Sequence, residues 1–214
     1  NVPTTSSGVY AYNLASISYS TSPSCPTLQT GSATVTVNPL PTATIGGATT
    51  VCLNSTQPVI TFTGSGGTSP YTFTYNINGG AAQTVTTTTG NSVTVSVPTS
   101  TAGTFTYNLT GVQDSATPSC TKPQTGSVII TVKSLPTATI SGTTTICQGG
   151  TSPFITFTGS GGTAPYTFTY NINGGASQTV ATTTGNSVIV SVPTSTSGTF
   201  TYNLTGVQDS ATPS

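Results

Sequence analysis

An internal repeat of 95 residues organises this chain. Residues 41–119 align with residues 136–214, and 66 of the 79 aligned positions are identical. Segments this similar must adopt the same fold, so the repeat defines the building unit of the protein. Residues 1–38 match the end of the same unit, and Ser214 matches Ser119.

The chain therefore divides into three repeats. We predict that residues 1–38 form the C-terminal part of a repeat, that residues 39–134 form a complete one, and that residues 135–214 form one that lacks its last strand. Both ends are expected to be cuts within a longer protein, with the secretion signal and the anchor outside this window. The short Pro-bearing linkers predict stiff junctions.

Within each repeat, apolar residues alternate with hydroxyl residues. The run YTFTYNI places Tyr71, Phe73 and Tyr75 on one face and Thr72 and Thr74 on the other. A period of two is typical of a β-strand with one buried face, and Gly and Pro clusters supply the turns between runs. In the complete repeat we expect strands near residues 42–45, 59–64, 71–77, 83–87, 92–97, 104–112 and 127–132.

About seven short strands in 95 residues, without a helical pattern, favour an all-β fold of tandem immunoglobulin-like two-sheet sandwiches. A small Greek-key barrel is the alternative. The inward register of the strands predicts an aromatic core. Its members are Phe62, Tyr71, Phe73, Tyr75, Phe105, Tyr107, Phe168, Tyr170, Phe200 and Tyr202.

Ionisable side chains are almost absent: the chain has two basic and two acidic residues and no His, against a usual charged content of about 25%. A neutral chain does not attract nucleic acids or anionic lipids, and no apolar run approaches a membrane span of about 20 residues. Acid–base catalysis and Ca²⁺ sites need clustered titratable groups or carboxylates. We expect no enzyme activity, no cofactor, no metal, no nucleic-acid partner and no membrane insertion in this window.

The motifs PTATISGTTTICQGG, ITFTGSGGTAPYTFTYNINGG and SGTFTYNLTGVQDSATPS, together with TGSVIITV, resemble the tandem Ig-like (PKD-like) repeats of giant surface proteins of Bacteroidota. These include the gliding adhesins of Flavobacterium-type bacteria, which the type IX secretion system exports. The resemblance covers the whole chain. It implies an extracellular stalk or filament on the bacterial cell surface, whose adhesive end lies outside this window.

The four cysteines fall into two classes at the 95-residue offset: Cys25 with Cys120, and Cys52 with Cys147. Without a CxxC motif or His, structural disulfides in an oxidising compartment are the favoured interpretation. Two pairings stay open. Cys52 bonds to Cys120 within one repeat, or Cys52 bonds to the equivalent of Cys120 in the next repeat, which falls at position 215.

Both acidic residues precede a serine in the sequence DSA. Asp-Ser followed by a small residue resembles the O-glycosylation acceptor of Bacteroidota, which implies glycans on Ser115 and Ser210. The alternative is an Asp that accepts backbone hydrogen bonds at a turn, and the two roles are compatible. The N-glycosylation sequons at Asn54, Asn108 and Asn203 are interpreted as coincidences in a Thr-rich chain.

The sequence thus predicts non-enzymatic structural repeats that give length and stiffness to an adhesin stalk or filament. Expected partners are neighbouring repeats, identical chains in a filament, and surface glycans. Carbohydrate binding is the first alternative, although sugar-binding faces need exposed aromatic side chains. Ice binding by outward Thr rows is a weaker one, because twisted short strands do not present a flat lattice.

Overall fold

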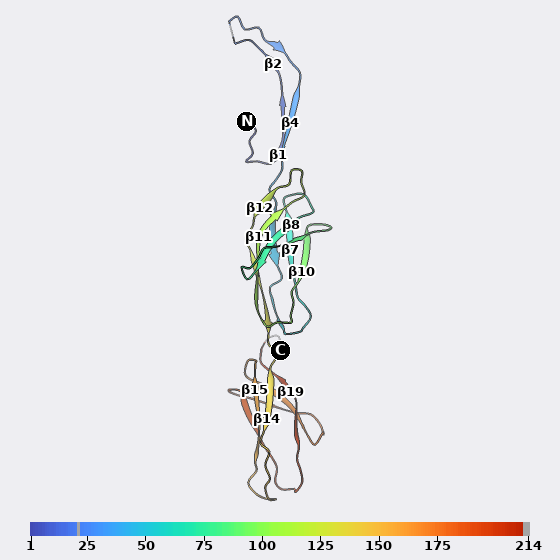
Figure 1. The fold of residues 1–214 in the computed structure, drawn as a ribbon, viewed down its shortest axis with the longest axis vertical. Helices are drawn as coiled ribbons and strands as arrows, with labels where there is room; N and C mark the ends of the chain where they lie inside the picture. The colour runs from blue at the N-terminus through green and yellow to red at the C-terminus, as the bar shows by residue number, and fades with distance from the viewer. Residues whose placement is uncertain (21, 212–214) are drawn as a thin grey trace. The chain divides into compact units, whose positions relative to one another are not determined.

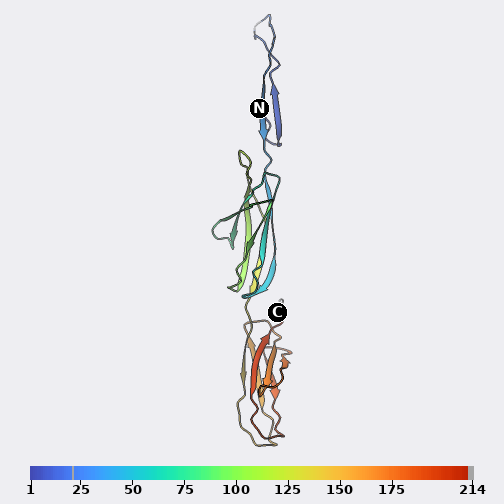
Figure 2. The ribbon, with the colours of Figure 1, turned by 90° about the vertical axis from the view of Figure 1, so that its right-hand side faces the viewer.

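The computed structural model describes residues 1–20 and 22–211, and within these ranges every regular element is a β-strand (Figure 1 and Figure 2). The prediction of an all-β chain is confirmed. No helix long and apolar enough to cross a membrane was found among the described residues.

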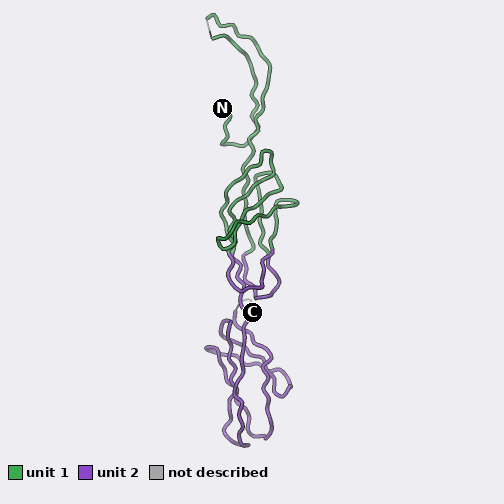
Figure 3. The backbone as a smooth tube through the Cα atoms, viewed as in Figure 1, with its two compact units in different colours: residues 1–47, 59–95, 106–128 green, residues 48–58, 96–105, 129–214 purple. Residues whose placement is uncertain are grey.

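Contacts divide the chain into two compact units (Figure 3). The first comprises residues 1–47, 59–95 and 106–128, and the second comprises residues 48–58, 96–105 and 129–214. This division does not follow the 95-residue period. The repeat boundaries at residues 38 and 134 therefore stay a prediction.

The first unit begins with two short antiparallel pairs. Strand β1 (Gly8–Asn13) pairs with β4 (Ser32–Val37) in the register Gly8 to Val37, and β2 (Ser16–Ile17) pairs with β3 (Thr27–Leu28). The β1–β4 sheet has two strands. Its apolar side chains are largely exposed: Val9 is 69% and Val35 is 38% accessible.

Residues 42–133 form two larger sheets. One has the order β10 (Ser92–Ser96), β7 (Val59–Ser65) and β5 (Thr42–Gly46). The other has the order β6-β13-β11-β8-β9, with β12 paired to β11. Its strands are β6 (Thr49–Cys52), β8 (Thr72–Ile77), β9 (Gln83–Thr86), β11 (Gly103–Gln113), β12 (Thr121–Pro123) and β13 (Ser127–Lys133).

The second unit contains two three-stranded sheets in the third repeat. One has the order β14 (Thr137–Ser141), β15 (Phe154–Ser160) and β18 (Ser187–Ser191). The other has the order β17 (Gln178–Ala181), β16 (Thr167–Ile172) and β19 (Tyr202–Gln208). Phe157 of the first sheet and Phe168 of the second belong to one buried cluster, so the two sheets share a core.

The two longer repeats use the same strand registers. Thr42 lies opposite Ser65 in β5–β7, and its equivalent Thr137 lies opposite Ser160 in β14–β15. Aromatic rings fill equivalent places: Phe62 stacks on Phe73 at 5.6 Å between ring centroids, and Phe157 stacks on Phe168 at 5.7 Å. The repeated sequence therefore specifies a repeated pairing scheme.

Close packing explains why the glycine-rich loop recurs unchanged. A β-carbon on Gly64 would lie 2.6 Å from the ring of Tyr71, so only glycine fits under this buried ring. The Tyr71 hydroxyl donates to the carbonyl of Gly67 at 2.9 Å. At the C-terminal end of β8, the turn residues Asn78 and Gly79 have φ angles of 51° and 73°. Asn and Gly tolerate these positive φ values best.

Candidate functional site

The titratable side chains do not gather into one site. Among the described residues, no group of three or more His, Cys, Asp or Glu side chains could hold a metal ion. The ionisable side chain with the clearest structural role is Asp114, which is buried.

Asp114 binds two backbone segments. Its Oδ2 atom accepts from the N–H of Thr68 at 3.1 Å, and its Oδ1 atom accepts from the N–H of Cys120 at 2.7 Å. The equivalent Asp209 accepts from the N–H of Thr163 at 2.8 Å. The two hydrogen bonds from backbone amides to Asp114 hold the loop after β11 in place.

Both candidate glycosylation serines are exposed and lie beside these aspartates. The Ser115 hydroxyl donates to the carbonyl of Thr68 at 3.1 Å, and that of Ser210 donates to the carbonyl of Ala164 at 2.8 Å. Their exposure leaves room for a modifying group, and glycosylation stays a prediction.

The cysteines occupy different environments. Cys25 and Cys147 are exposed, whereas Cys52 and Cys120 are half-buried. Cys52 lies opposite Lys133 in the parallel β6–β13 pair. Within the described part of the chain, no two of the four cysteines form a disulfide. Cys52 also lines a cavity of about 140 Å³ together with Asp209 and Ala211.

Most of the expected core residues are buried. This set comprises Phe62, Tyr71, Phe73, Tyr75, Tyr107, Phe168 and Tyr170, all between 0 and 5% accessible. Phe105 and Tyr202 are half-buried. Burial raises the pKa of the Tyr107 hydroxyl, and the neighbouring Tyr75 raises it further; the same causes, with Tyr170 as neighbour, raise the pKa of Tyr202.

Phe200 is the exception, because its side chain is 37% accessible. Its equivalent Phe105 lies in β11, which begins at Gly103, whereas β19 begins only at Tyr202. In the second repeat, β13 is the neighbour of β11 in the sheet order. In the third repeat, the positions equivalent to β13 fall after residue 214, so residues 198–201 are described without that neighbour.

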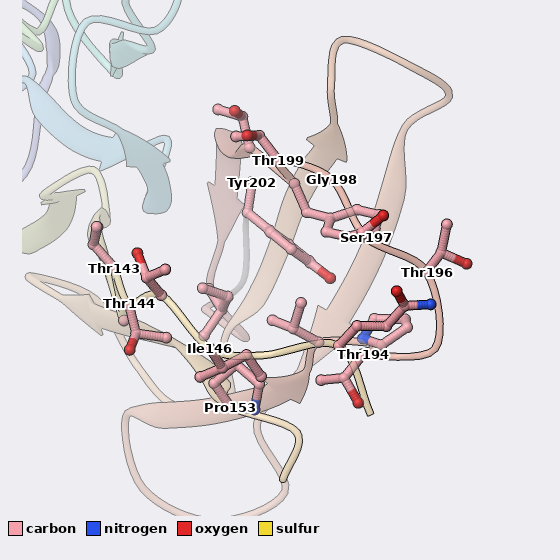
Figure 4. Close-up of a pocket in the computed structure, with 18 of the residues that line it drawn as sticks. Thr143, Thr144, Ile146, Pro153, Thr194, Thr196, Ser197, Gly198, Thr199 and Tyr202 are labelled. Carbon is pink, nitrogen blue, oxygen red and sulfur yellow. The ribbon is translucent and has the colours of Figure 1, made fainter. Parts of the chain in front are cut away.

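A groove lies at this position. Its volume is about 530 Å³, and its lining includes residues 143–147 on one side and residues 198–202 on the other. Figure 4 shows Thr144 and Ile146 at one wall and Thr199 and Tyr202 at the other.

The second repeat shows what normally occupies such a groove. Residues 143–147 are equivalent to residues 48–52, which include β6, and residues 198–202 are equivalent to residues 103–107, the start of β11. In the second repeat β13 lies between these two segments and pairs in parallel with β6 from Thr49 to Cys52. The groove of the third repeat therefore lies at the place that β13 takes in the second repeat.

The chemistry of the groove suits an extended backbone. Residues 143–147 belong to no strand of the described structure, so their backbone groups lack the ladder that Thr49–Cys52 form with β13. Ile140, Ile155 and Tyr202 contribute apolar lining, and the lining contains no charged side chain. Sequence reasoning did not predict this groove.

No family model matches the chain, and no curated protein matches it. A solved chain from a Ca²⁺-stabilised adhesin, which helps an Antarctic bacterium reach out and bind ice, is 23% identical with a TM-score of 0.46. The match covers 86% of this chain and 49% of that chain.

A second solved chain comes from a study of how a 1.5-MDa bacterial ice-binding adhesin is retained at the host cell surface. It is 21% identical with a TM-score of 0.40, and the match covers 78% of this chain and 60% of that chain. Both alignments thus span less than two thirds of the solved chains.

Proposed function

We propose that this chain is a structural segment of an extracellular adhesin stalk or surface filament, in which each repeat is an immunoglobulin-like two-sheet sandwich. The observation that carries the proposal is the repetition itself, in which 66 of 79 positions and the strand registers recur. A sequence copied along one chain adds length without adding a new site.

The third repeat supports the sandwich. Its two three-stranded sheets bury Phe157, Tyr166, Phe168 and Tyr170 in one cluster. The sheets alternate inward apolar and outward polar residues, as in β16, where buried Phe168 and Tyr170 flank half-buried Thr169. Aligned packing of two such sheets is the geometry of immunoglobulin-like domains.

The outward hydroxyls also support a structural role, because they bond to each other across strands. Thr42 bonds to Ser65 at 2.8 Å, and the equivalent Thr137 bonds to Ser160 at the same distance. Cross-strand pairs of this kind stabilise sheets by about 0.2 to 1 kcal/mol each. These pairs add cohesion without charged side chains.

The linkers are tied to the repeats that follow them. Asn38 donates from Nδ2 to the carbonyl of Pro118 at 3.3 Å, and the Ser134 hydroxyl donates to the carbonyl of Gly161 at 2.6 Å. A linker residue that bonds to a loop of the next repeat restricts rotation at the junction. This supports a semi-rigid stalk over a flexible tether.

The wider assignment rests on the resemblance of the motifs and belongs to this proposal. It places the protein on a bacterial cell surface, as a Bacteroidota adhesin exported by type IX secretion, with O-linked glycans on Ser115 and Ser210. Glycans would keep nearly uncharged fibres apart in water. Intact-mass measurement of the protein secreted by its natural host, before and after deglycosylation, tests the glycans.

The stalk function is tested by small-angle X-ray scattering on chains with one, two and three complete repeats. We expect the maximum dimension to rise by a constant increment with each added repeat. On cells, deleting repeats should reduce adhesion while leaving export unchanged. A maximum dimension that stays nearly constant as repeats are added would contradict a stalk.

A further inference from the structure

We propose that the open edge of strand β18 binds the same edge of a second molecule, so that two chains lie side by side through one continuous β-sheet. The two copies of β18 run antiparallel about a two-fold axis at Ile189. This goes beyond the proposed function, because it assigns an interaction surface to the outside of one repeat. The edge is defined by its backbone groups, by the order of its side chains and by the exposed face beside it.

Strand β18 has a free edge, since it pairs only with β15 in its sheet. In an antiparallel pair, alternate residues bond to the neighbouring strand, and the residues between them point their N–H and C=O groups the other way. The carbonyl of Asn186 accepts from the N–H of Gly159 at 2.8 Å. The N–H of Val192 donates to the carbonyl of Pro153 at 2.9 Å. The residues that face the open edge are therefore Ser187, Ile189 and Ser191.

The same edge is open in the second repeat, where β13 is present. Strand β10 is the equivalent of β18 and ends the sheet order β10-β7-β5. The opposite edge of that sheet is capped, because Oε1 of Gln124 accepts from the N–H of Ala43 in β5 at 3.1 Å. Among the described residues, the edge-facing backbone groups of β18 have no such cap. The free edge is thus a property of the fold that both repeats share.

The sequence of β18 suits pairing with itself. It reads Ser-Val-Ile-Val-Ser, which is the same in both directions about Ile189. In a two-fold antiparallel pair, the two copies of Ile189 face each other, each Val188 faces a Val190, and each Ser187 faces a Ser191. The Ile pair and the Ser pairs then exchange N–H and C=O bonds, so every free backbone group at the edge gains a partner. A closed two-fold contact of this kind uses the same patch on both molecules.

The outward face beside this edge is more apolar in the third repeat than in the second. Phe154 and Ile189 are 54% and 56% accessible, and their equivalents are Val59 and Thr94. Phe154 lies opposite Ser191 in the β15–β18 register, which makes it the diagonal neighbour of Ile189 on the same face. Two-fold pairing would bring the Ile189 side chains together between the two Phe154 rings and remove apolar surface from water. This difference favours β18 over β10 as the binding edge.

Strand β18 lacks the usual protection against pairing. Edge strands are commonly protected by charged side chains, by Pro or by a bulge. Strand β18 contains no charged residue and no Pro, and its five pairs with β15 run without a register shift. A contact between two short strands buries little surface, so we expect a reversible, concentration-dependent dimer and not a permanent one.

The first test follows the mass of the 214-residue chain by sedimentation equilibrium over a series of concentrations. We expect the average mass to rise toward that of a dimer. Ile189→Lys and Ile189→Glu should each raise the dissociation constant at least about tenfold, because like charges then lie opposite each other. An equimolar mixture of the two variants should associate again, since opposite charges meet only where residue 189 faces itself. Thr94→Lys is the matched control in β10 and should associate as wild type does.

The urea midpoint of each variant shows that it is folded, as expected for a substitution at an exposed side chain. A wild-type chain that stays monomeric overturns the proposal. So does an Ile189→Lys chain that associates as wild type does, or a mixture of folded Lys and Glu variants that stays monomeric. Loss of association in Thr94→Lys but not in Ile189→Lys overturns β18 as the binding edge.

The second test uses the wild-type chain alone, so it does not depend on how a variant folds. Hydrogen exchange is followed by mass spectrometry in dilute and in concentrated solution. We expect slower exchange at residues 187–191 in the associated state and unchanged exchange at residues 92–96. Association without protection of residues 187–191 overturns the proposed interface. Neither test bears on the proposed stalk function, which depends on the length of a single chain.

Discussion

Asp114 and Cys120 are joined by two hydrogen bonds. The N–H of Cys120 donates to Oδ1 of Asp114 at 2.7 Å, and the N–H of Asp114 donates to the carbonyl of Cys120 at 3.1 Å. The pair closes the loop between β11 and β12 and fixes the position of the cysteine. Its equivalent in the third repeat begins with Asp209, and the partner falls at position 215 by the 95-residue offset.

Replacing Asp114 by Asn should destabilise the protein. The Asn side chain has one acceptor oxygen, which can accept from only one of the two N–H groups, that of Thr68 or that of Cys120. Its NH2 group then faces the other N–H, so one buried hydrogen bond is lost and two donors point at each other. We expect a loss of about 2 to 3 kcal/mol in the free energy of unfolding. Urea denaturation measures this loss. Asp209→Asn is the matched control and should cost less, and equal losses would contradict the role given to the Cys120 bond.

Gly67→Ala should also destabilise the fold. A β-carbon there would lie 2.6 Å from Oδ2 of Asp114, whose position is held by its own hydrogen bonds. We expect a loss of about 2 kcal/mol or more. Gly46 is the control, because a β-carbon on it meets nothing within 4 Å, and Gly46→Ala should stay within about 0.5 kcal/mol. Equal melting temperatures for the two variants would show that the loop adjusts without cost.

The cavity shared by Cys52 and Asp209 favours a disulfide between repeats. Asp114 holds Cys120 through its backbone, so Asp209 should hold a residue at position 215 in the same way, beside Cys52. Pairing within one repeat is less favourable. Cys52 lies opposite Lys133, the last residue of β13, whereas Cys120 precedes the first residue of that strand. The seven residues of β13 span about 20 Å. A disulfide needs the two Cα atoms to lie within about 7 Å of each other.

We therefore predict that a chain extended by one cysteine, at position 215, forms a bond to Cys52. Oxidised glutathione accepts the two electrons and two protons of the thiols. Peptide mapping without reduction should find the Cys52 peptide joined to the new C-terminus, and Cys52→Ser should remove that species. Recovery of a Cys52–Cys120 peptide instead would favour the pairing within one repeat.

Alkaline pH should weaken the fold through Tyr107. Burial raises its pKa in the folded state above the value of about 10 in an unfolded chain, so the folded protein favours the neutral phenol. Below about pH 10, Tyr107 is neutral in both the folded and the unfolded protein, so the free energy of unfolding is unaffected. As the pH rises through the higher pKa of the folded state, the unfolded chain ionises first and the free energy of unfolding falls. Tyr107→Phe should lose less stability between about pH 8 and pH 11 than wild type. Tyr19→Phe, at a side chain that is 77% exposed, is the matched control.

Alternation of apolar and polar side chains was sufficient to locate several strands of the second repeat. The predicted strand at 104–112 corresponds to Gly103–Gln113, and that at 83–87 corresponds to Gln83–Thr86. In these segments one face is apolar and Gly or Pro lies near the ends, so local chemistry and final pairing agree.

Strands that depend on a distant neighbour were not predicted. Thr49–Cys52 and Thr121–Pro123 show no alternation and exist because β13 and β11 pair with them. Phe200 has the same sequence pattern as Phe105 but is more exposed, and the positions equivalent to β13 fall after residue 214. The backbone role of Asp114 was one of two predicted roles, and its partner Cys120 was not foreseen because hydrogen bonds to backbone leave no sequence pattern.

The central claim is that the 95-residue repeat is a folding unit closed by its last strand. Urea unfolding of the isolated segments 39–134 and 135–214, followed by circular dichroism, tests it most directly. We predict one cooperative transition for 39–134, which contains β13, and a transition at clearly lower urea concentration for 135–214. A segment 39–134 without a cooperative transition, or two segments of equal stability, would contradict the claim.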